Sequence, residues 1–250
     1  MSGDRLSLKG TELFYTVEGS GSPVLLIHGW TCDQNDWAFQ IPYLISLGFS
    51  VIGLDLRGHG RSTFNYDSVF DPLTLANDAI ALLSHLGIGR GNEAIVMGHS
   101  LGGVVANEIA FRHPEYVRGI VLVDPAYEMP AAALDHFNQL LKKNIDKCPE
   151  TVTDLWNTAN LYPPNTPVWL KPWQRRRTWG TNPRVVTASF DQMASYLGQS
   201  GVEYLNKTKK RDIPRLVTCA LNTSVEIEME AGMDSSFDRV ELTGLPRDDS

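Results

Sequence analysis

Apolar and polar positions alternate along the first half of the chain in blocks that predict strands and helices in turn. Short apolar blocks at 6–8 and 13–17 flank Lys9-Gly10-Thr11 and predict a β-hairpin. The next block, Val24-Leu25-Leu26-Ile27, is apolar throughout, which suits a parallel strand covered on both faces. We expect further strands at 49–54, 94–97 and 119–124, and helices at 37–47, 73–86 and 104–111. This order predicts an α/β fold with a mostly parallel, doubly wound sheet.

The pattern changes after Asp124. From 127 to 212, Pro, Trp, Tyr and Arg follow one another without strand alternation, so this segment is expected to be an insertion of helices and loops. Its clearest helical patterns are at 129–141 and 187–197, and strands are expected again at 213–219 and 237–242. The predicted organisation is therefore a core part at 1–126, an inserted helical segment at 127–212, and a C-terminal core part at 213–250.

Composition narrows the class of protein. A chain of 250 residues with 42% hydrophobic residues suits one α/β domain with an insertion. The formal net charge of −7 gives no electrostatic reason to expect nucleic acid or an anionic membrane surface as a partner. Arg175-Arg176-Arg177 is a basic run, and we expect it on a solvated loop.

The sequence also predicts a cytoplasmic protein without cofactors. Cys32, Cys148 and Cys219 are far apart and odd in number, so they are expected to be reduced thiols. The first residues lack the apolar core of a signal peptide, and no stretch has the roughly 18 apolar residues of a membrane span. No cluster has metal-ligand spacing, and Gly19-Ser20-Gly21 does not begin a helix as a dinucleotide-binding loop would.

The candidate chemistry centres on Gly98-His99-Ser100-Leu101-Gly102, a G-x-S-x-G pentapeptide between a predicted strand and a predicted helix. In that position it is a nucleophile elbow, a tight turn from which the serine hydroxyl projects. Gly98 and Gly102 are expected to be structural, because strand and helix come too close there for a Cβ atom. The Leu101 N–H can point at an oxyanion near Ser100. The alternative is a glycine-rich turn without catalytic function.

Together with the elbow, three more motifs resemble those of the α/β-hydrolase fold family. These are Leu-Ile-His-Gly-Trp at 26–30, Asp-Leu-Arg-Gly-His-Gly-Arg-Ser at 55–62 and Val-Leu-Val-Asp at 121–124, in the family's order. They resemble its lid-bearing branch of esterases, lactonases, carbon-carbon hydrolases and haloperoxidase-like enzymes, and cover 1–126. The resemblance implies an α/β-hydrolase fold with an inserted helical lid, and a second oxyanion N–H at Trp30. The Trp30 ring is also a candidate for packing at the pocket mouth, and His28 is expected to be structural.

The resemblance implies a serine hydrolase that acts on a small, mostly apolar substrate with an ester, lactone or carbon-carbon bond. Small-molecule metabolism is the setting that such an activity suggests. Epoxide hydrolases of the family carry aspartate at the elbow, whereas this chain has Ser100, which favours acyl transfer. Several aromatic residues of the insertion are candidates for an apolar pocket, although each could equally hold the lid together: Tyr127, Trp156, Tyr162, Trp169, Trp173 and Trp179.

A serine nucleophile needs a base, and the family places a histidine after the last strand. The last histidine of this sequence is His136, which we weigh as an unconventional base, whereas His99 is expected to be buried beside the sheet. At the usual position of the acid stands Asn222, which carries no charge. Asp124 is the alternative acid, or else it caps the following loop. Asp234 and Asp238 are expected to be solvated.

The missing histidine leaves two alternatives open. One is a catalytically degenerate member that binds a small molecule or a partner, and the other is a biosynthetic enzyme that works without an acyl-enzyme. The sequence as given also lacks the family's closing helix, so we expect a homodimer contact or a partner subunit over the C-terminal region.

Overall fold

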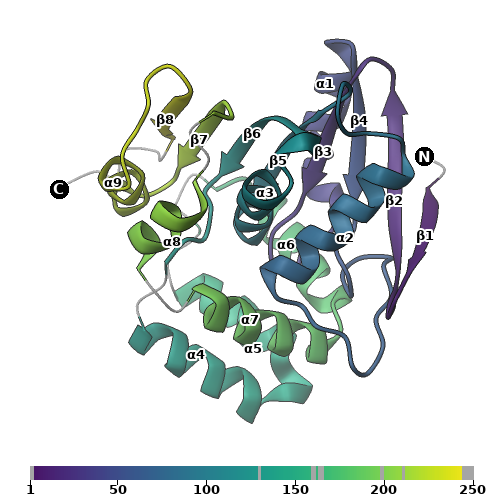
Figure 1. The fold of residues 1–250 in the computed structure, drawn as a ribbon. Coiled ribbons are helices and arrows are strands. Elements are labelled where there is room, and N and C mark those ends of the chain that lie inside the picture. The colour runs from purple at the N-terminus through teal and green to yellow at the C-terminus, as the bar shows by residue number, and fades with distance from the viewer. Residues whose placement is uncertain are drawn as a thin grey trace.

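The computed structural model describes residues 3–128, 131–158, 162, 166–197, 200–209 and 212–243. Within them, one eight-stranded sheet has the strand order β1-β2-β4-β3-β5-β6-β7-β8 (Figure 1). The strands are β1 (Asp4–Leu8), β2 (Thr11–Gly19), β3 (Ser22–Ile27), β4 (Phe49–Leu54), β5 (Ala94–His99), β6 (Val117–Val123), β7 (Arg215–Cys219) and β8 (Asp238–Leu242). The β1–β2 and β2–β4 pairs are antiparallel, and the other pairs are parallel. The prediction of a mostly parallel α/β sheet is therefore confirmed.

Strand β3 shows how the sheet is covered on both faces. Leu25 and Ile27 belong to the core cluster that includes residues of α2 (Pro72–His85) and α3 (Leu101–Arg112). Val24 and Leu26 belong to a second cluster with residues of α1 (Gln40–Ser46). Because successive strand residues point to opposite faces, α1 lies across the sheet from α2 and α3. All of Val24-Leu25-Leu26-Ile27 is buried, as the sequence predicts for this strand.

The helix expected at 37–47 is two elements in the structure. A 3-10 turn, η1 (Gln34–Trp37), begins earlier, and α1 starts only at Gln40. The cause is local, because the Asp33 carboxylate caps η1 by accepting a hydrogen bond from the Asn35 N–H. The predicted end is correct, since Gly48 follows α1 with φ +83°, where glycine is favoured.

The segment between β6 and β7 is helical. It contains α4 (Ala131–Lys143), α5 (Cys148–Thr158), α6 (Leu170–Gly180), α7 (Pro183–Leu197) and α8 (Gly201–Thr208), with a short 3-10 turn, η3 (Ile145–Lys147), before α5. Another 3-10 turn, η2 (Pro114–Tyr116), lies outside this segment and joins α3 to β6. Figure 1 shows α4, α5 and α7 as a layer at one end of the sheet. The helices expected at 129–141 and 187–197 correspond to α4 and α7, although Met129 lies outside the described residues. The sequence patterns missed α5, α6, α8 and α9 (Asn222–Glu230).

The prediction for the basic run was wrong, because Arg175-Arg176-Arg177 lies in α6 rather than in a solvated loop. Arg177 is buried and forms an ion pair with Asp36 of η1. Arg175 and Arg176 are exposed on the same helix. Helical periodicity explains the difference, because consecutive residues of a helix point in different directions around its axis.

The interpretation of Asp238 as a solvated residue was also wrong. Its side chain is buried and forms an ion pair of 2.8 Å with Lys209. The neighbouring Glu228 carboxylate accepts a hydrogen bond of 2.8 Å from the Tyr127 hydroxyl and one of 3.0 Å from Arg215 Nη2. These five buried side chains join the loop after β6 to α8, β7, α9 and β8. The network fixes the C-terminal strands against the start of the helical insertion.

Three further expectations concern thiols, membranes and metals. Cys32, Cys148 and Cys219 are all buried free thiols, as predicted. Among the described helices, none combines the length and the apolar character needed to cross a membrane. The described residues also hold no group of three or more His, Cys, Asp or Glu side chains arranged to bind a metal ion.

Candidate active site

Ser100 stands on a strained turn between β5 and α3. Its φ of 53° and ψ of −115° lie outside the regions that L-residues favour. The turn is so tight that a Cβ atom on Gly98 would collide with the Gly102 backbone, and one on Gly102 would collide with the Ile27 carbonyl oxygen. Both glycines are therefore required by close backbone approach, as the elbow motif predicts.

The backbone of Ser100 is held by the end of the neighbouring strand. Its N–H donates a hydrogen bond of 2.9 Å to the Val123 carbonyl oxygen of β6. Its own carbonyl oxygen accepts hydrogen bonds from the N–H groups of Gly103 at 2.9 Å and Ala126 at 3.3 Å. These bonds link the elbow to α3 and to the loop after β6, so the strained conformation is supported from two directions.

Strained backbone conformations occur at the carboxyl ends of three adjacent strands. Among the described residues, the non-glycine residues with positive φ are Thr31 at 56°, Ser100 at 53° and Asp124 at 45°. They follow β3, β5 and β6, which are adjacent strands of the sheet. Such conformations cost of order 1–3 kcal/mol each and persist where the surrounding structure imposes them, commonly at functional sites. The strain therefore marks the carboxyl ends of these strands as the candidate site.

Two backbone N–H groups near Ser100 are available as oxyanion donors. Neither the Trp30 N–H nor the Leu101 N–H donates to an acceptor among the described residues. Gly29, which precedes Trp30, lies against the elbow, because a Cβ atom there would be 3.3 Å from Ser100 Cβ. The loop after β3 and the start of α3 thus meet beside Ser100, which is the arrangement that two converging donors require.

The Trp30 ring contacts the helical insertion. Its indole Nε1 donates hydrogen bonds of 3.1 Å to both the Val186 carbonyl oxygen and Ser189 Oγ of α7. The ring also packs against Phe137 of α4 and Phe190 of α7, with centroid distances of 5.8 and 4.9 Å. Trp30 therefore joins α4 and α7 to the loop that carries the candidate oxyanion donor.

Asp124 follows β6 and lies in the same region. Its N–H donates a hydrogen bond of 2.7 Å to the Thr218 carbonyl oxygen, and its Oδ1 accepts one of 2.9 Å from the Ala220 N–H. Burial lowers the pKa of His99, and the charge of Asp124 opposes that shift. Asn222, at the position where the resemblance places the acid, is exposed at the start of α9. Asp124 thus provides a carboxylate at the carboxyl end of β6, whereas residues 220–224 contain none.

Ser100 Oγ has no hydrogen-bond partner among the described residues, and no described histidine contacts it. His136 is exposed on α4, and His99 is almost fully buried. Residues 244–250 lie outside the described part of the chain, and their sequence contains no histidine. A base for Ser100 is therefore not identified in this structure.

His28 is held as a neutral tautomer by its backbone contacts. Its Nδ1 donates a hydrogen bond of 2.8 Å to the Gly29 carbonyl oxygen, and its Nε2 accepts one of 3.0 Å from the Leu56 N–H. Burial lowers the pKa of His28 to about 4 and that of the neighbouring His59 to about 3. His28 thus fixes the loop that carries Trp30, in agreement with the structural role expected for it.

A hollow of about 250 Å³ with aromatic and charged side chains in its lining lies beside His99 of the elbow, and Ser100 is not among its lining residues. His99 and Val123, the last residues of β5 and β6, form part of it, and the aromatic side chains of Trp37, Phe39, Trp169 and Trp173 surround them. Of the aromatic residues proposed for a pocket, Trp169 and Trp173 belong to this hollow. Tyr127 is buried in the Glu228 network, Tyr162 lies under Lys171, Trp179 stacks on Arg175, and the Trp156 side chain lies outside the described residues. Trp37 and Phe39 were missed, although their apolar character was visible in the sequence.

Comparison with known proteins agrees with this geometry. The family model described as "alpha/beta hydrolase fold" matches residues 22–153. A non-heme haloperoxidase from Rhodococcus erythropolis is 39% identical over 104 residues, which are 42% of this chain and 36% of that protein. A soluble epoxide hydrolase from Corynebacterium sp. (strain C12) is 37% identical over 117 residues, 47% of this chain and 39% of that protein. The matched stretch thus spans about two-fifths or less of the length of these relatives.

Solved structures share the whole fold at lower sequence identity. A thermophilic esterase from Thermogutta terrifontis has a TM-score of 0.79 and 23% identity, covering 96% of this chain and 90% of that one. An enol-lactonase from Burkholderia xenovorans LB400 has a TM-score of 0.77 and 18% identity, with coverage of 96% and 90%. At these identities the likeness concerns the fold alone.

Proposed function

Because this chain belongs to the α/β-hydrolase fold family, we propose that it is a hydrolase of small, mostly apolar esters or lactones that uses Ser100 as nucleophile. The observation that carries the proposal is the strained elbow at Ser100, beside which the N–H groups of Trp30 and Leu101 have no acceptors among the described residues. The solved structures named as an esterase and an enol-lactonase show that this fold accommodates such substrates in other proteins.

The reaction would begin with attack of Ser100 Oγ on the carbonyl carbon. The carbonyl oxygen becomes an oxyanion that accepts hydrogen bonds from the N–H groups of Trp30 and Leu101. The bond to the alcohol oxygen then breaks, and the proton lost from the Ser100 hydroxyl leaves on that alcohol. Loss of one such donor typically costs about 2.7–4 kcal/mol of transition-state stabilisation. Water would release the acyl group from Ser100 in the second half of the reaction. Asp124 is the proposed acid of the site.

A second function is favoured by one observation, namely that no described histidine reaches Ser100 Oγ. Without a histidine base, turnover of a serine hydrolase falls by about a millionfold, which corresponds to roughly 8 kcal/mol of barrier. The oxyanion donors and substrate binding would retain about 10³ to 10⁴ over water. On this alternative, the protein binds a small molecule, or acts on one without an acyl-enzyme.

Labelling with a fluorophosphonate separates the two functions, because only an activated serine reacts quickly with it. The hydrolase proposal expects rapid labelling of the wild-type protein and none of Ser100→Ala. Ser46→Ala is the matched control, since Ser46 is exposed in α1 and its hydroxyl donates to the Tyr43 carbonyl oxygen. Absence of labelling in the folded wild-type protein would contradict the hydrolase proposal and favour the binding function.

A further inference from the structure

A second cavity, of about 330 Å³, lies between α6 and the loop that joins β4 to α2. Arg61 of that loop lines it together with Arg176 and Arg177 of α6. The single carboxylate in the lining belongs to Asp33, and the remaining lining residues are uncharged. Arginine side chains from two separate elements therefore converge on one space.

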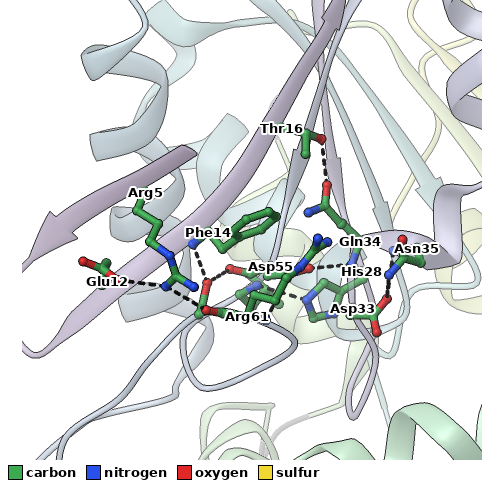
Figure 2. Close-up of polar contacts among 12 residues, drawn as sticks. Arg5, Glu12, Phe14, Thr16, His28, Asp33, Gln34, Asn35, Asp55 and Arg61 are labelled. Atoms are coloured by element: carbon green, nitrogen blue, oxygen red, sulfur yellow. Dashed lines mark hydrogen bonds and ion pairs between the residues drawn. The ribbon is translucent and has the colours of Figure 1, made fainter. Parts of the chain in front are cut away.

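The carboxylates near this cavity already have backbone donors. Asp33 Oδ1 accepts hydrogen bonds from the Asn35 N–H at 2.9 Å and from Asn35 Nδ2 at 2.8 Å. Asp55 accepts hydrogen bonds from the N–H groups of Gln34 at 2.8 Å and Arg61 at 2.9 Å (Figure 2). Both carboxylates thus have donors that do not come from a guanidinium group.

The guanidinium groups are correspondingly less well paired. Arg61 Nε lies 3.3 Å from Asp55 Oδ2, and Arg176 Nη2 lies 3.4 Å from Asp33 Oδ2. Strong charge-assisted hydrogen bonds are shorter, at about 2.7–2.9 Å. Arg177 is buried and its Nη1 pairs with Asp36, and its Nε, which has no partner among the described residues, is itself buried away from the cavity. The donors free for a further acceptor therefore belong to Arg61 and Arg176.

Arg61 is also held in place before any ligand binds. Its guanidinium carbon lies 3.8 Å from the centroid of the Phe14 ring, so the group is stacked on an aromatic face (Figure 2). Stacking of this kind fixes the plane of the guanidinium and leaves its edge free to donate. Less side-chain entropy is then lost when an anion binds.

We propose that this cavity binds a small organic phosphate, whose phosphoryl oxygens accept hydrogen bonds from Arg61 and Arg176. A guanidinium group suits a phosphoryl group, because its planar N–H donors can bind two oxygens at once. The cavity is larger than a bare phosphate ion, so the rest of its volume is assigned to the organic part of the ligand. Because Ser100 does not line this cavity, the site is separate from the proposed hydrolytic centre.

Isothermal titration calorimetry with phenyl phosphate tests the proposal. We expect binding that weakens as sodium chloride is added, because both partners are charged. Arg176→Ala should lower the affinity at least about tenfold, as expected when a hydrogen bond to a charged group is lost. The side chain of Arg176 is 58% exposed, so this variant is expected to fold. No binding of phenyl phosphate at millimolar concentration would overturn the proposal.

Arg175→Ala is the matched control. Arg175 belongs to the same helix and the same basic run, but it lies over the Trp179 ring and does not line the cavity. The Arg175→Ala protein should bind phenyl phosphate with the affinity of the wild-type protein. An equal loss of affinity in Arg175→Ala and Arg176→Ala would show that only general surface charge attracts the ligand, and would contradict the proposed site. Tighter binding of benzoate would contradict the assignment to phosphate. Inorganic phosphate binding as tightly as phenyl phosphate would contradict an organic ligand.

Discussion

Asp124 Oδ1 accepts a hydrogen bond of 2.9 Å from the backbone N–H of Ala220, which ties the loop after β6 to the end of β7. The same carboxylate is the proposed acid of the Ser100 site. The Asp124 side chain therefore has both a structural role, as acceptor for the Ala220 N–H, and a proposed catalytic role. Asparagine keeps the accepting oxygen and tolerates the φ of 45°, but removes the charge. Substitution can therefore separate the structural role from the catalytic one.

For Asp124→Asn, we expect the free energy of unfolding to change by less than about 1 kcal/mol, while fluorophosphonate labelling slows at least about a hundredfold. Asp124→Ala should be destabilised as well, because it loses the acceptor for the Ala220 N–H. Urea unfolding and labelling rates measure the two effects. Unchanged labelling in a stable Asp124→Asn protein would show that the residue only caps the loop.

The second prediction concerns the tightness of the elbow. Gly98→Ala should lower the free energy of unfolding by about 1–3 kcal/mol or more, because the added Cβ meets the Gly102 backbone. Gly180→Ala is the control, since nothing lies within 4 Å of a Cβ atom there. That variant should be neutral or up to about 1 kcal/mol more stable. Equal stabilities of the two variants in urea would contradict the close packing of strand and helix.

The third prediction concerns the buried charges of the C-terminal core. Glu228→Gln removes the negative charge that faces Arg215, so we expect a loss of about 3 kcal/mol in the free energy of unfolding. Glu12→Gln breaks an exposed ion pair with Arg5 and should cost at most about 1 kcal/mol. Denaturant unfolding of both variants measures the contrast. A change below 1 kcal/mol for Glu228→Gln would argue against the network.

The fourth prediction follows from His28 and His59. Burial lowers the pKa of His28 from 6.5 to about 4 and that of His59 to about 3, so the unfolded chain binds protons at a higher pH than the folded one. Stability is therefore fully present above about pH 6.5, and it falls as the pH drops from there towards 4, by on the order of 3 kcal/mol for His28. Below the pKa values that His28 and His59 have in the folded protein, these residues cause no further loss in the free energy of unfolding.

Urea unfolding at pH 8 and pH 5 measures this dependence. His28→Asn should flatten the slope of stability against pH, since one of the three described buried histidines with a lowered pKa is gone. His136→Gln is the control, because His136 is exposed on α4, and it should keep the wild-type slope. The same slope in His28→Asn and the wild-type protein would contradict the proposed origin of the acid sensitivity.

The sequence by itself determined the strand-and-helix order of the core and the elbow. Both are local properties, because consecutive apolar residues form a buried strand wherever two faces are covered, and Gly98 and Gly102 specify the turn around Ser100. The sequence also identified Trp30 as a residue of the site, either as the second oxyanion N–H or through packing of its ring at the mouth of the pocket. The helix α6 escaped detection, since tryptophans and arginines interrupt the apolar period on which such predictions depend.

Only the tertiary structure decided which polar residues meet. Arg177 and Asp36 are separated by more than a hundred residues, as are Tyr127 and Glu228, and their pairing depends on how whole elements pack. Burial of Asp238 likewise follows from the approach of Lys209 on α8, which no local pattern records. The cavity between Arg61 and Arg176 arises in the same way. Charge pairing and cavities result from long-range packing, whereas secondary structure results mainly from neighbouring residues.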